Sequence, residues 1–280
     1  MVIEEYIVRK KKLIDKALDR YLPSSDTKPK VLHEAMRYSV LSGGKRIRPI
    51  LAIASFEACG GKANEILSLA CSIELIHAYT LIHDDLPALD NDDYRRGKPT
   101  CHKKFGEDIA LLAGDSLLTL SFEILADTKN IKLIKKVSHL VGSSGTIGGQ
   151  VADIRHKLQD TLLRQGYGGQ ARHRSQDLEY IARQKTGALF EAAIVSAGIL
   201  KGVSKKKLNA LTKYSKCIGL TFQLIDDLLD KDGYYKLHGA EYIDKRANLL
   251  IKKAKSSISI FGSKRQALAD LADLILKRRA

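Results

Sequence analysis

A long apolar segment that ends in a cluster of aspartates places the strongest limit on how this chain can fold. Residues 65–86 are rich in Leu, Ile and Ala, carry few charges and show helical rather than alternating spacing. A helix of this composition is buried on most of its sides. It must therefore be surrounded by other elements, and the rest of the chain has to supply them.

The same helical spacing recurs along the chain. Further helices are expected over residues 3–22, 32–41, 50–59, 108–126, 131–140, 143–158, 178–200, 205–229, 240–258 and 265–277. No segment has a convincing alternating strand pattern, and only five of the 280 residues are proline. We predict an all-α protein, a single domain over residues 1–280 in which a helical bundle surrounds a central cavity.

Charge and cysteine usage narrow the class of protein further. The net charge of +15 suits an anionic partner, such as nucleic acid, a membrane surface or a phosphorylated small molecule. The cations alternate with acidic clusters, so we expect no nucleic acid as partner. Glu74, Asp115 and Asp127 interrupt the longest apolar runs before the roughly 18–20 residues of a membrane span, and no such span is expected. Four scattered cysteines favour reduced thiols and a cytoplasmic location.

The first acidic cluster is the segment His83-Asp84-Asp85-Leu86-Pro87-Ala88-Leu89-Asp90. Several carboxylates at the end of a buried helix are costly unless a cation neutralises them. Magnesium suits this position because it prefers oxygen ligands and is often shared between carboxylates and phosphates. Pro87 interrupts the regular turn, so Asp90 is expected to return towards Asp84.

The second acidic cluster is Gln223-Leu224-Ile225-Asp226-Asp227-Leu228-Leu229-Asp230. Asp226 and Asp230 are four residues apart and share one helix face, whereas Asp227 points elsewhere. Neither cluster has the glycine turn and terminal Glu of a calcium-binding loop. One acidic helix end is usually solvated, but two clusters embedded in apolar helices indicate a site for a cation.

Basic motifs accompany the carboxylates. Ser42-Gly43-Gly44-Lys45-Arg46-Ile47-Arg48 combines a flexible turn with three cations that can bind anionic oxygens. Arg95-Arg96-Gly97 follows the first acidic cluster, as expected around a metal–diphosphate complex. Lys185 lies in an apolar helix, where a lysine needs a partner.

Taken together, these motifs resemble the trans-type isoprenyl diphosphate synthases, in particular the bacterial farnesyl diphosphate synthase group. The matching pieces include Glu74-Leu75-Ile76-His77, Gly148-Gly149-Gln150 with Asp153, and Lys185-Thr186-Gly187, besides the clusters above. They occur in the family's order over most of the chain. The resemblance implies an isoprenoid-synthase type of helical fold, a homodimer, and a magnesium-dependent prenyltransferase.

The resemblance also implies a role for each matching residue. Catalytic roles fall on Asp84, Asp85, Asp90, Lys185, Gln223 and Asp226. Magnesium, three ions once substrate is bound, would be held by Asp84, Asp90, Asp226 and Asp230. Substrate binding would fall on Lys45, Arg48, His77, Arg95, Arg96, Thr186 and Lys231. Lys45, Arg48, His77 and Arg96 would hold isopentenyl diphosphate, whereas Arg95 and Lys185 would hold the allylic diphosphate.

Product length is expected to depend on Tyr79, which lies five residues before Asp84 and close to the same helix line. A ring there would close the end of the product cavity. The farnesyl diphosphate synthases that this chain resembles carry an aromatic residue there together with the two-residue insertion Pro87-Ala88, and the resemblance implies farnesyl diphosphate as the product. The alternatives are a geranylgeranyl diphosphate synthase, a non-catalytic regulatory subunit of a heteromeric synthase, and a related terpene cyclase or head-to-head condensing enzyme. The glycine–cation motif around Lys45 argues against the cyclase because it serves a second diphosphate.

Two places depart from the family pattern. A loop of roughly a dozen or more residues is missing after Asp230, where Lys231 leads directly into Asp232-Gly233-Tyr234. The loop has either been deleted or is a mobile lid missing from the sequence, and we favour the second interpretation. An insertion is expected near residues 160–176, centred on the glycine-rich segment from Gln165 to Arg174.

Overall fold

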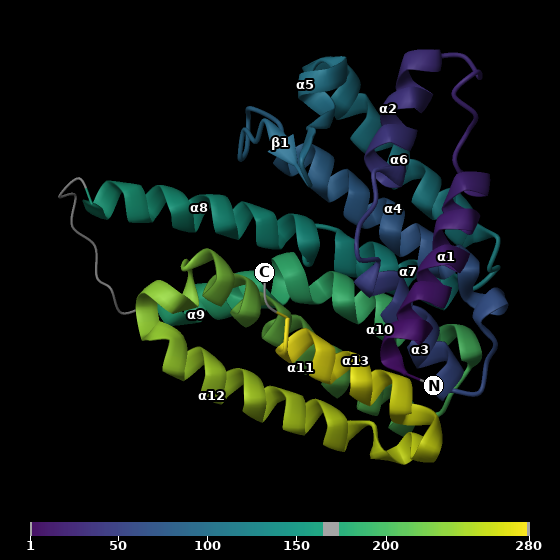
Figure 1. The fold of residues 1–280 in the computed structure, drawn as a ribbon, viewed down its shortest axis with the longest axis vertical. Helices are drawn as coiled ribbons and strands as arrows, with labels where there is room; N and C mark the ends of the chain where they lie inside the picture. The colour runs from purple at the N-terminus through teal and green to yellow at the C-terminus, as the bar shows by residue number, and fades with distance from the viewer. Residues whose placement is uncertain (1, 165–173, 279–280) are drawn as a thin grey trace. The chain divides into compact units, whose positions relative to one another are not determined.

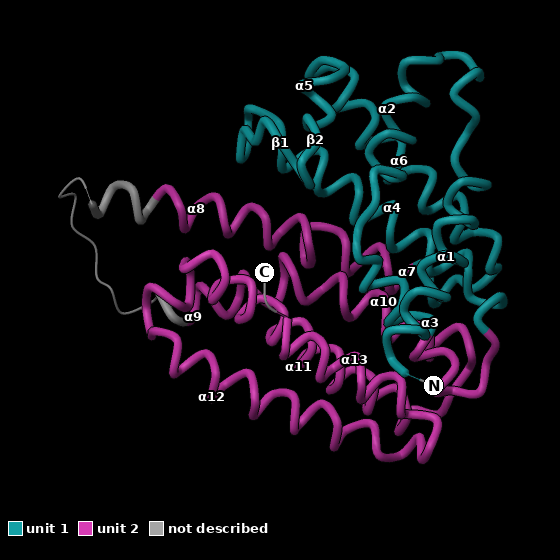
Figure 2. The backbone as a smooth tube through the Cα atoms, viewed as in Figure 1, with its two compact units in different colours: residues 1–53, 63–134 teal, residues 54–62, 135–280 magenta. Residues whose placement is uncertain are grey.

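The computed structural model describes residues 2–164 and 174–278. For residues 159–164, 174 and 175 it describes the backbone alone. Its contacts divide the chain into two compact units, residues 1–53 with 63–134 and residues 54–62 with 135–280 (Figure 2). Each unit has its own packed helices and its own share of the predicted site residues. The single-domain interpretation stays a prediction.

The first unit is helical apart from one short hairpin (Figure 1). Its elements are α1 (Ile3–Tyr21), α2 (Lys30–Leu41), the start of α3 (Ile47–Ala58), the 3-10 helix η1 (Ala63–Ile66), α4 (Leu67–Asp84), β1 (Tyr94–Arg95), β2 (Lys98–Pro99), α5 (Cys101–Phe105), α6 (Glu107–Ala126) and the start of α7 (Ile131–Val141). Asn130 caps α7 by accepting a hydrogen bond from the backbone N–H of Leu133 at 3.1 Å.

Helix α4 forms the core of the first unit. Its buried positions run without a break from Leu69 to Ile76, which explains the low charge of this segment. It packs against α1, α2 and α6. Gly114 permits the contact with α6, since a Cβ there would lie 2.1 Å from Nε2 of His83. The prediction of a helix buried on most sides is therefore confirmed.

The second unit is also helical. Its elements are the remainder of α3 and α7, α8 (Thr146–Arg164), α9 (Arg174–Ile181), the π-helix η3 (Ala182–Gly187), α10 (Ala188–Lys201), α11 (Lys205–Asp230), α12 (Tyr234–Ser257), the 3-10 helix η4 (Ser259–Arg265) and α13 (Gln266–Leu276). A cluster of buried side chains joins η3, α11 and α12, namely Ala182, Leu220, Leu224, Tyr234 and Ile243. Helix α12 bends at Gly239, whose backbone is not helical.

The all-α prediction is confirmed, with two local differences. The continuous helix expected over residues 178–200 contains a π-helical segment, η3. A two-residue antiparallel ladder joins β1 and β2, with Arg95 opposite Lys98. Such a ladder is too short to produce the alternating pattern by which strands are recognised in a sequence.

The junction after Asp230 is a short turn between two helices. Helix α11 ends at Asp230, Lys231 adopts a left-handed conformation, and α12 starts at Tyr234. Backbone hydrogen bonds close this turn from Asp232 N to Asp227 O (3.0 Å) and from Tyr235 N to Asp232 O (2.9 Å). The two helices are therefore joined directly within a continuous chain. The interpretation that a mobile lid is missing from the sequence stays a prediction.

The expected insertion lies mostly outside the described residues. Helix α8 continues to Arg164 and α9 begins at Arg174, so the ends of the 160–176 segment are helical. Residues 165–173, which carry the glycine-rich core of that prediction, are not among the described residues.

The expectation about apolar length also needs correction. Two helical segments, Ala63–Asp84 and Glu107–Ala126, are long and apolar enough by composition to cross a membrane. Within the structure, 67% of the apolar window of the first segment is buried, against 39% for the second. A buried core helix meets the same criterion, so length and composition alone do not identify either segment as a membrane span.

Candidate active site

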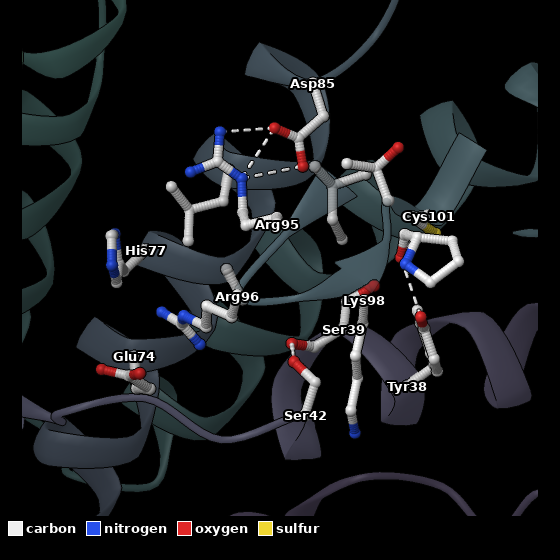
Figure 3. A pocket seen from close by; sticks show the side chains of 15 residues that line it. Tyr38, Ser39, Ser42, Glu74, His77, Asp85, Arg95, Arg96, Lys98 and Cys101 are labelled. Carbon is white, nitrogen blue, oxygen red and sulfur yellow. Dashed lines mark hydrogen bonds and ion pairs between the residues drawn. The ribbon is translucent and has the colours of Figure 1, made fainter. Parts of the chain in front are cut away.

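A pocket lined by both polar and apolar side chains, with about 510 Å³ of empty space that is partly open to solvent, lies in the first unit (Figure 3). Helices α2 and α4 and the β1–β2 hairpin supply its walls. The lining includes four of the predicted site residues, His77, Asp85, Arg95 and Arg96. Residues 45, 48, 84 and 90 are not among its lining residues.

The hairpin turn separates the two arginines of the Arg-Arg-Gly motif. Arg96 and Gly97 form the two-residue turn between β1 and β2, with φ values of 53° and 72°. Positive φ at both central residues is typical of the turn that matches the twist of a hairpin, and it explains why a glycine follows the arginines. Arg95 remains in the strand, so the neighbouring guanidinium groups have different partners.

Arg95 binds the second aspartate of the first acidic cluster. Its Nε lies 2.7 Å and 3.0 Å from the two carboxylate oxygens of Asp85, and Nη2 also reaches Asp92 at 3.2 Å (Figure 3). Burial raises the pKa of Asp85, and the contact with Arg95 opposes that rise. In this structure Asp85 is therefore largely neutralised by a side chain of the protein.

Arg96 has no such counter-charge. Its Nη1 donates to the carbonyl oxygen of Gly43, and the described residues provide it with no carboxylate partner. Burial lowers the pKa of Arg96, as expected for a cation removed from water without an ion pair. Gly44 makes room for the guanidinium, since a Cβ at that position would lie 2.7 Å from Nη1. An exposed guanidinium at the edge of a pocket is well suited to bind an anion.

His77 contributes a neutral ring to the same pocket. Burial, followed by the positive charges of Arg48, Arg96 and other arginines, lowers its pKa well below the usual 6.5. The ring Nε2 lies 3.4 Å from Nη1 of Arg48. His77 is therefore neutral at physiological pH and can donate or accept a hydrogen bond without adding charge.

The loop after α4 brings the first and third aspartates of the first cluster together along the backbone. The N–H of Asp90 donates to the carbonyl oxygen of Asp84 at 2.9 Å. This return after Pro87 confirms the predicted approach of Asp90 to Asp84. Asp84 is the last residue of α4, so its position follows directly from where the helix ends.

In the second unit, the π-helix η3 carries Lys185 and Thr186. A π-helical turn is uncommon and occurs mostly at functional sites. Gly149 of the Gly-Gly-Gln motif allows α8 to approach it, because a Cβ there would lie 2.1 Å from the backbone N of Lys185. Lys185 Nζ binds Asp153 Oδ2 at 2.7 Å. Burial alone would raise the pKa of Asp153, but the contact with Lys185 helps to lower it.

A chain of hydrogen bonds links η3 to α11 and to the start of α12. Thr186 Oγ1 donates to Gln223 Oε1 at 2.6 Å, and Gln223 Nε2 donates to Asp227 Oδ1 at 2.7 Å. The other carboxylate oxygen of Asp227 accepts the backbone N–H of Tyr234 at 2.8 Å, at the first turn of α12. Burial raises the pKa of Asp227 to about 6, against those two donors. Asp227 therefore faces the protein interior, as the helix spacing predicts.

Asp226 lies on the other face of α11 and has a basic partner near the end of the chain. Arg278 Nη1 lies 2.7 Å from Asp226 Oδ1, and its guanidinium carbon lies 4.5 Å from the centre of the Phe222 ring. Asp230 and Lys231 are exposed at the end of the same helix. Within the described chain, neither of them has a side-chain partner.

The carboxylates fit magnesium by their chemistry. Their oxygens are the ligands that Mg²⁺ prefers, and Asp226 already holds a cation, the guanidinium of Arg278. Among the described residues, no group of three or more His, Cys, Asp or Glu side chains is placed to hold a metal by itself. Mg²⁺ commonly binds through one or two carboxylates together with substrate phosphates, so this donor set fits an ion that arrives with a diphosphate.

Comparison with known proteins identifies the family. A family model described as polyprenyl synthetase matches residues 29–260. The chain belongs to the polyprenyl synthetase family. It is 40% identical to a geranylgeranyl diphosphate synthase of Cyanophora paradoxa over 98% of this chain and 95% of the relative. A dimethylallyltranstransferase of Fischerella ambigua is also 40% identical, over 99% of this chain and 84% of its own. The chain is accordingly a prenyltransferase with prenyl diphosphate synthase activity.

Solved structures agree with this assignment. An FPP/GFPP synthase from Zymomonas mobilis matches with a TM-score of 0.89 and 33% identity, over 98% of both chains. A putative farnesyl-diphosphate synthase from Marinomonas sp. MED121 matches with a TM-score of 0.85 and 36% identity, over 99% of this chain and 100% of that one. The alignment with the Cyanophora relative spans 300 positions, more than the 280 residues of this chain. That relative thus has residues without a counterpart in this sequence.

Three residues of the synthase gain a role only from the structure. Arg46 belongs to the glycine–cation motif but is buried among carboxylates rather than presented to the pocket. Asp227 binds the start of α12, and Arg278 binds Asp226. Of these three residues, the sequence singles out only Asp227, because its spacing puts it on a different helix face from Asp226 and Asp230.

Proposed function

We propose that the synthase condenses isopentenyl diphosphate with dimethylallyl or geranyl diphosphate and releases farnesyl diphosphate as its main product. The observation that carries the choice of product is the position of Tyr79. Its side chain is only 5% exposed, and its ring meets the His83 ring edge-on at 5.7 Å. Five residues of α-helix span about 7.5 Å, so the ring lies well below Asp84 along α4, where a growing apolar chain would end.

The chemistry requires a leaving diphosphate and a second anchored diphosphate. We propose that Asp84, Asp90, Asp226 and Asp230 hold Mg²⁺, which neutralises the departing pyrophosphate when bound. Arg95 and Lys185 would exchange Asp85 and Asp153 for oxygens of the allylic diphosphate. Lys45, Arg48, His77 and Arg96 would bind isopentenyl diphosphate, and Lys231 would also contact substrate. Thr186 and Gln223 would direct oxygen dipoles towards the allylic cation that remains when the C–O bond to pyrophosphate breaks. The double bond of isopentenyl diphosphate attacks that cation and forms the new C–C bond, and the resulting cation loses a proton to pyrophosphate.

Geranylgeranyl diphosphate is the second candidate product. It is supported by the names of relatives, such as the geranylgeranyl pyrophosphate synthase of Capsicum annuum, which is 39% identical over 98% of this chain. A product with five more carbons needs a deeper cavity. Tyr79 is the residue of α4 whose size bears most directly on that depth.

One experiment tests activity and product together. Purified protein is incubated with radiolabelled isopentenyl diphosphate and each allylic primer, with Mg²⁺ or with EDTA, and the products are separated by chromatography. The proposal expects a magnesium-dependent fifteen-carbon product, and a longer product from Tyr79→Ala. A twenty-carbon product from the unmodified protein, or the same product from both proteins, overturns the role of Tyr79.

We also propose that the synthase works as a homodimer in the cytoplasm. Two adjacent leucines of α6, Leu111 and Leu112, are 47% and 51% exposed, which supports an apolar contact between copies. Light scattering on the purified chain tests the dimer. Activity of that single chain also separates the proposal from the alternative of a non-catalytic subunit, which would need a partner to turn over substrate.

A further inference from the structure

Arg46 occupies the most completely neutralised cationic position in the glycine–cation motif. Its side chain is only 2% exposed. Nη1 binds Glu74 at 2.7 Å, Nε binds Asp15 at 2.8 Å, and Nη2 donates to the carbonyl oxygen of Val40 at 2.7 Å. Although burial would lower it, the pKa of Arg46 is raised by Glu74 and then Asp15. One guanidinium therefore joins α1, the last turn of α2 and α4.

The partners of Arg46 separate it from the neighbouring cations. Glu74 is itself only 4% exposed, so removal of either charge would leave the other buried without compensation. Lys45, the preceding residue, is exposed instead. The positive charge available to a ligand therefore belongs to residues such as Lys45 and Arg96, and not to Arg46.

The backbone of Arg46 shapes the turn that carries these ligand-binding cations. Its φ is 50°, in the left-handed region, and its carbonyl accepts the N–H of Ile50 at 3.0 Å as α3 begins. Left-handed backbone at a residue with a side chain persists only where surrounding contacts hold it. The three contacts of the guanidinium provide that restraint.

The same contacts extend to the pocket wall. Glu74 lies three residues before His77 on α4 and, like His77, lines the pocket (Figure 3). Upstream of Arg46, the carbonyl of Gly43 accepts the hydrogen bond from Arg96. Arg46 lies three residues after Gly43, and its partner Glu74 lies three residues before His77, so the guanidinium ties these two segments to one another.

We propose that Arg46 is a positioning residue for the isopentenyl diphosphate subsite: it orders the turn from Gly43 to Arg48 against α4 and does not itself touch the substrate. This inference rests on the proposed function, which assigns that diphosphate to Lys45, Arg48, His77 and Arg96. Misplacement of those groups weakens the binding of one substrate and leaves the allylic diphosphate unaffected.

Arg46→Lys tests the proposal because it keeps the charge but loses the three-way fork. We expect the KM for isopentenyl diphosphate to rise about tenfold, with the KM for the allylic substrate changed by less than about twofold. Glu74→Gln, which leaves Arg46 in place, should shift the same ratio in the same direction. It also provides a second variant if Arg46→Lys does not fold.

Arg37→Lys is the matched control. Arg37 also joins a carboxylate, Asp19, to backbone carbonyls, those of Leu22 and Pro23 at 3.3 Å, but it does not line the pocket. We expect this control to lower the melting temperature and to leave the ratio of the two KM values unchanged. A second readout is the thermal stabilisation produced by isopentenyl diphosphate alone, which should be reduced for Arg46→Lys only.

The outcomes separate this inference from the proposed function. An active wild-type enzyme whose Arg46→Lys and Arg37→Lys variants show the same KM ratio overturns the positioning role alone, because Arg46 would then contribute only to stability. A wild-type protein that neither turns over isopentenyl diphosphate nor is stabilised by it overturns the proposed function, and this inference with it.

Discussion

Arg278 forms an ion pair with Asp226, with 2.7 Å between Nη1 and Oδ1. The two residues are far apart in the sequence, and the contact joins the end of α13 to the second acidic cluster on α11. Arg278 also lies over the Phe222 ring. The carboxylate proposed to bind magnesium therefore has a cation of the protein as its partner in this structure.

Arg278→Gln should strengthen the binding of divalent metal to the synthase. A metal at Asp226 must replace the guanidinium, and a partly exposed ion pair of this kind contributes about 0–1 kcal/mol. We expect the Kd for Mn²⁺, measured by calorimetry in the presence of pyrophosphate, to fall by up to about fivefold. Lys277→Gln removes the same charge from the neighbouring exposed residue and is the control. An equal change in both variants would show that only net charge matters.

Tyr79→Phe should stabilise the protein and leave the product unchanged. The hydroxyl of Tyr79 is buried and has no hydrogen-bond partner within the described chain. Removal of an unsatisfied buried hydroxyl is expected to raise the free energy of unfolding by about 1 kcal/mol. The ring remains, so the product length should stay the same. Urea denaturation and chromatography measure the two effects, and a longer product would mean that the hydroxyl rather than the ring limits the chain.

Asp227 should make stability depend on pH. Its pKa is raised from 3.8 to about 6 in the folded protein, chiefly by burial. The folded state therefore keeps this proton to higher pH than the unfolded state, and the free energy of unfolding falls as pH rises from about 4 to about 6. Relative to Asp227→Asn, the wild type should lose about 2 kcal/mol over that range. Denaturation at several pH values in EDTA measures the difference, and parallel curves would contradict it.

Gly44 and Gly43 form a matched pair for testing the Arg96 contact. Both have positive φ, 133° and 102°, so alanine strains the backbone at either position. A Cβ at Gly44 would also displace the guanidinium of Arg96, whereas a Cβ at Gly43 meets nothing within 4 Å. Gly44→Ala should therefore raise the KM for isopentenyl diphosphate several-fold more than Gly43→Ala.

Thermal denaturation of both glycine variants serves as the control for this comparison. Similar losses of stability would show that the strain is matched. If their KM values were then also equal, the approach of Arg96 to Gly44 would have no part in substrate binding.

The sequence by itself determined the helical class, most helix positions and the two acidic clusters, because these depend on local spacing. Residues 65–86 predict a buried helix by composition, and the four-residue spacing of Asp226 and Asp230 puts Asp227 on another face. Pro87 likewise indicates the backbone return of Asp90 to Asp84.

Only the tertiary structure decided which charges are neutralised and which remain available. Lys45 and Arg46 are adjacent cations in the sequence, yet Arg46 is enclosed by Glu74 and Asp15 from two other helices while Lys45 is exposed. The sequence shows Arg278 only as one of several neighbouring basic residues and does not indicate its partner. The structure places that partner, Asp226, on α11. The physical reason is that burial and ion pairing arise from contacts between residues distant in the chain, which local periodicity does not encode.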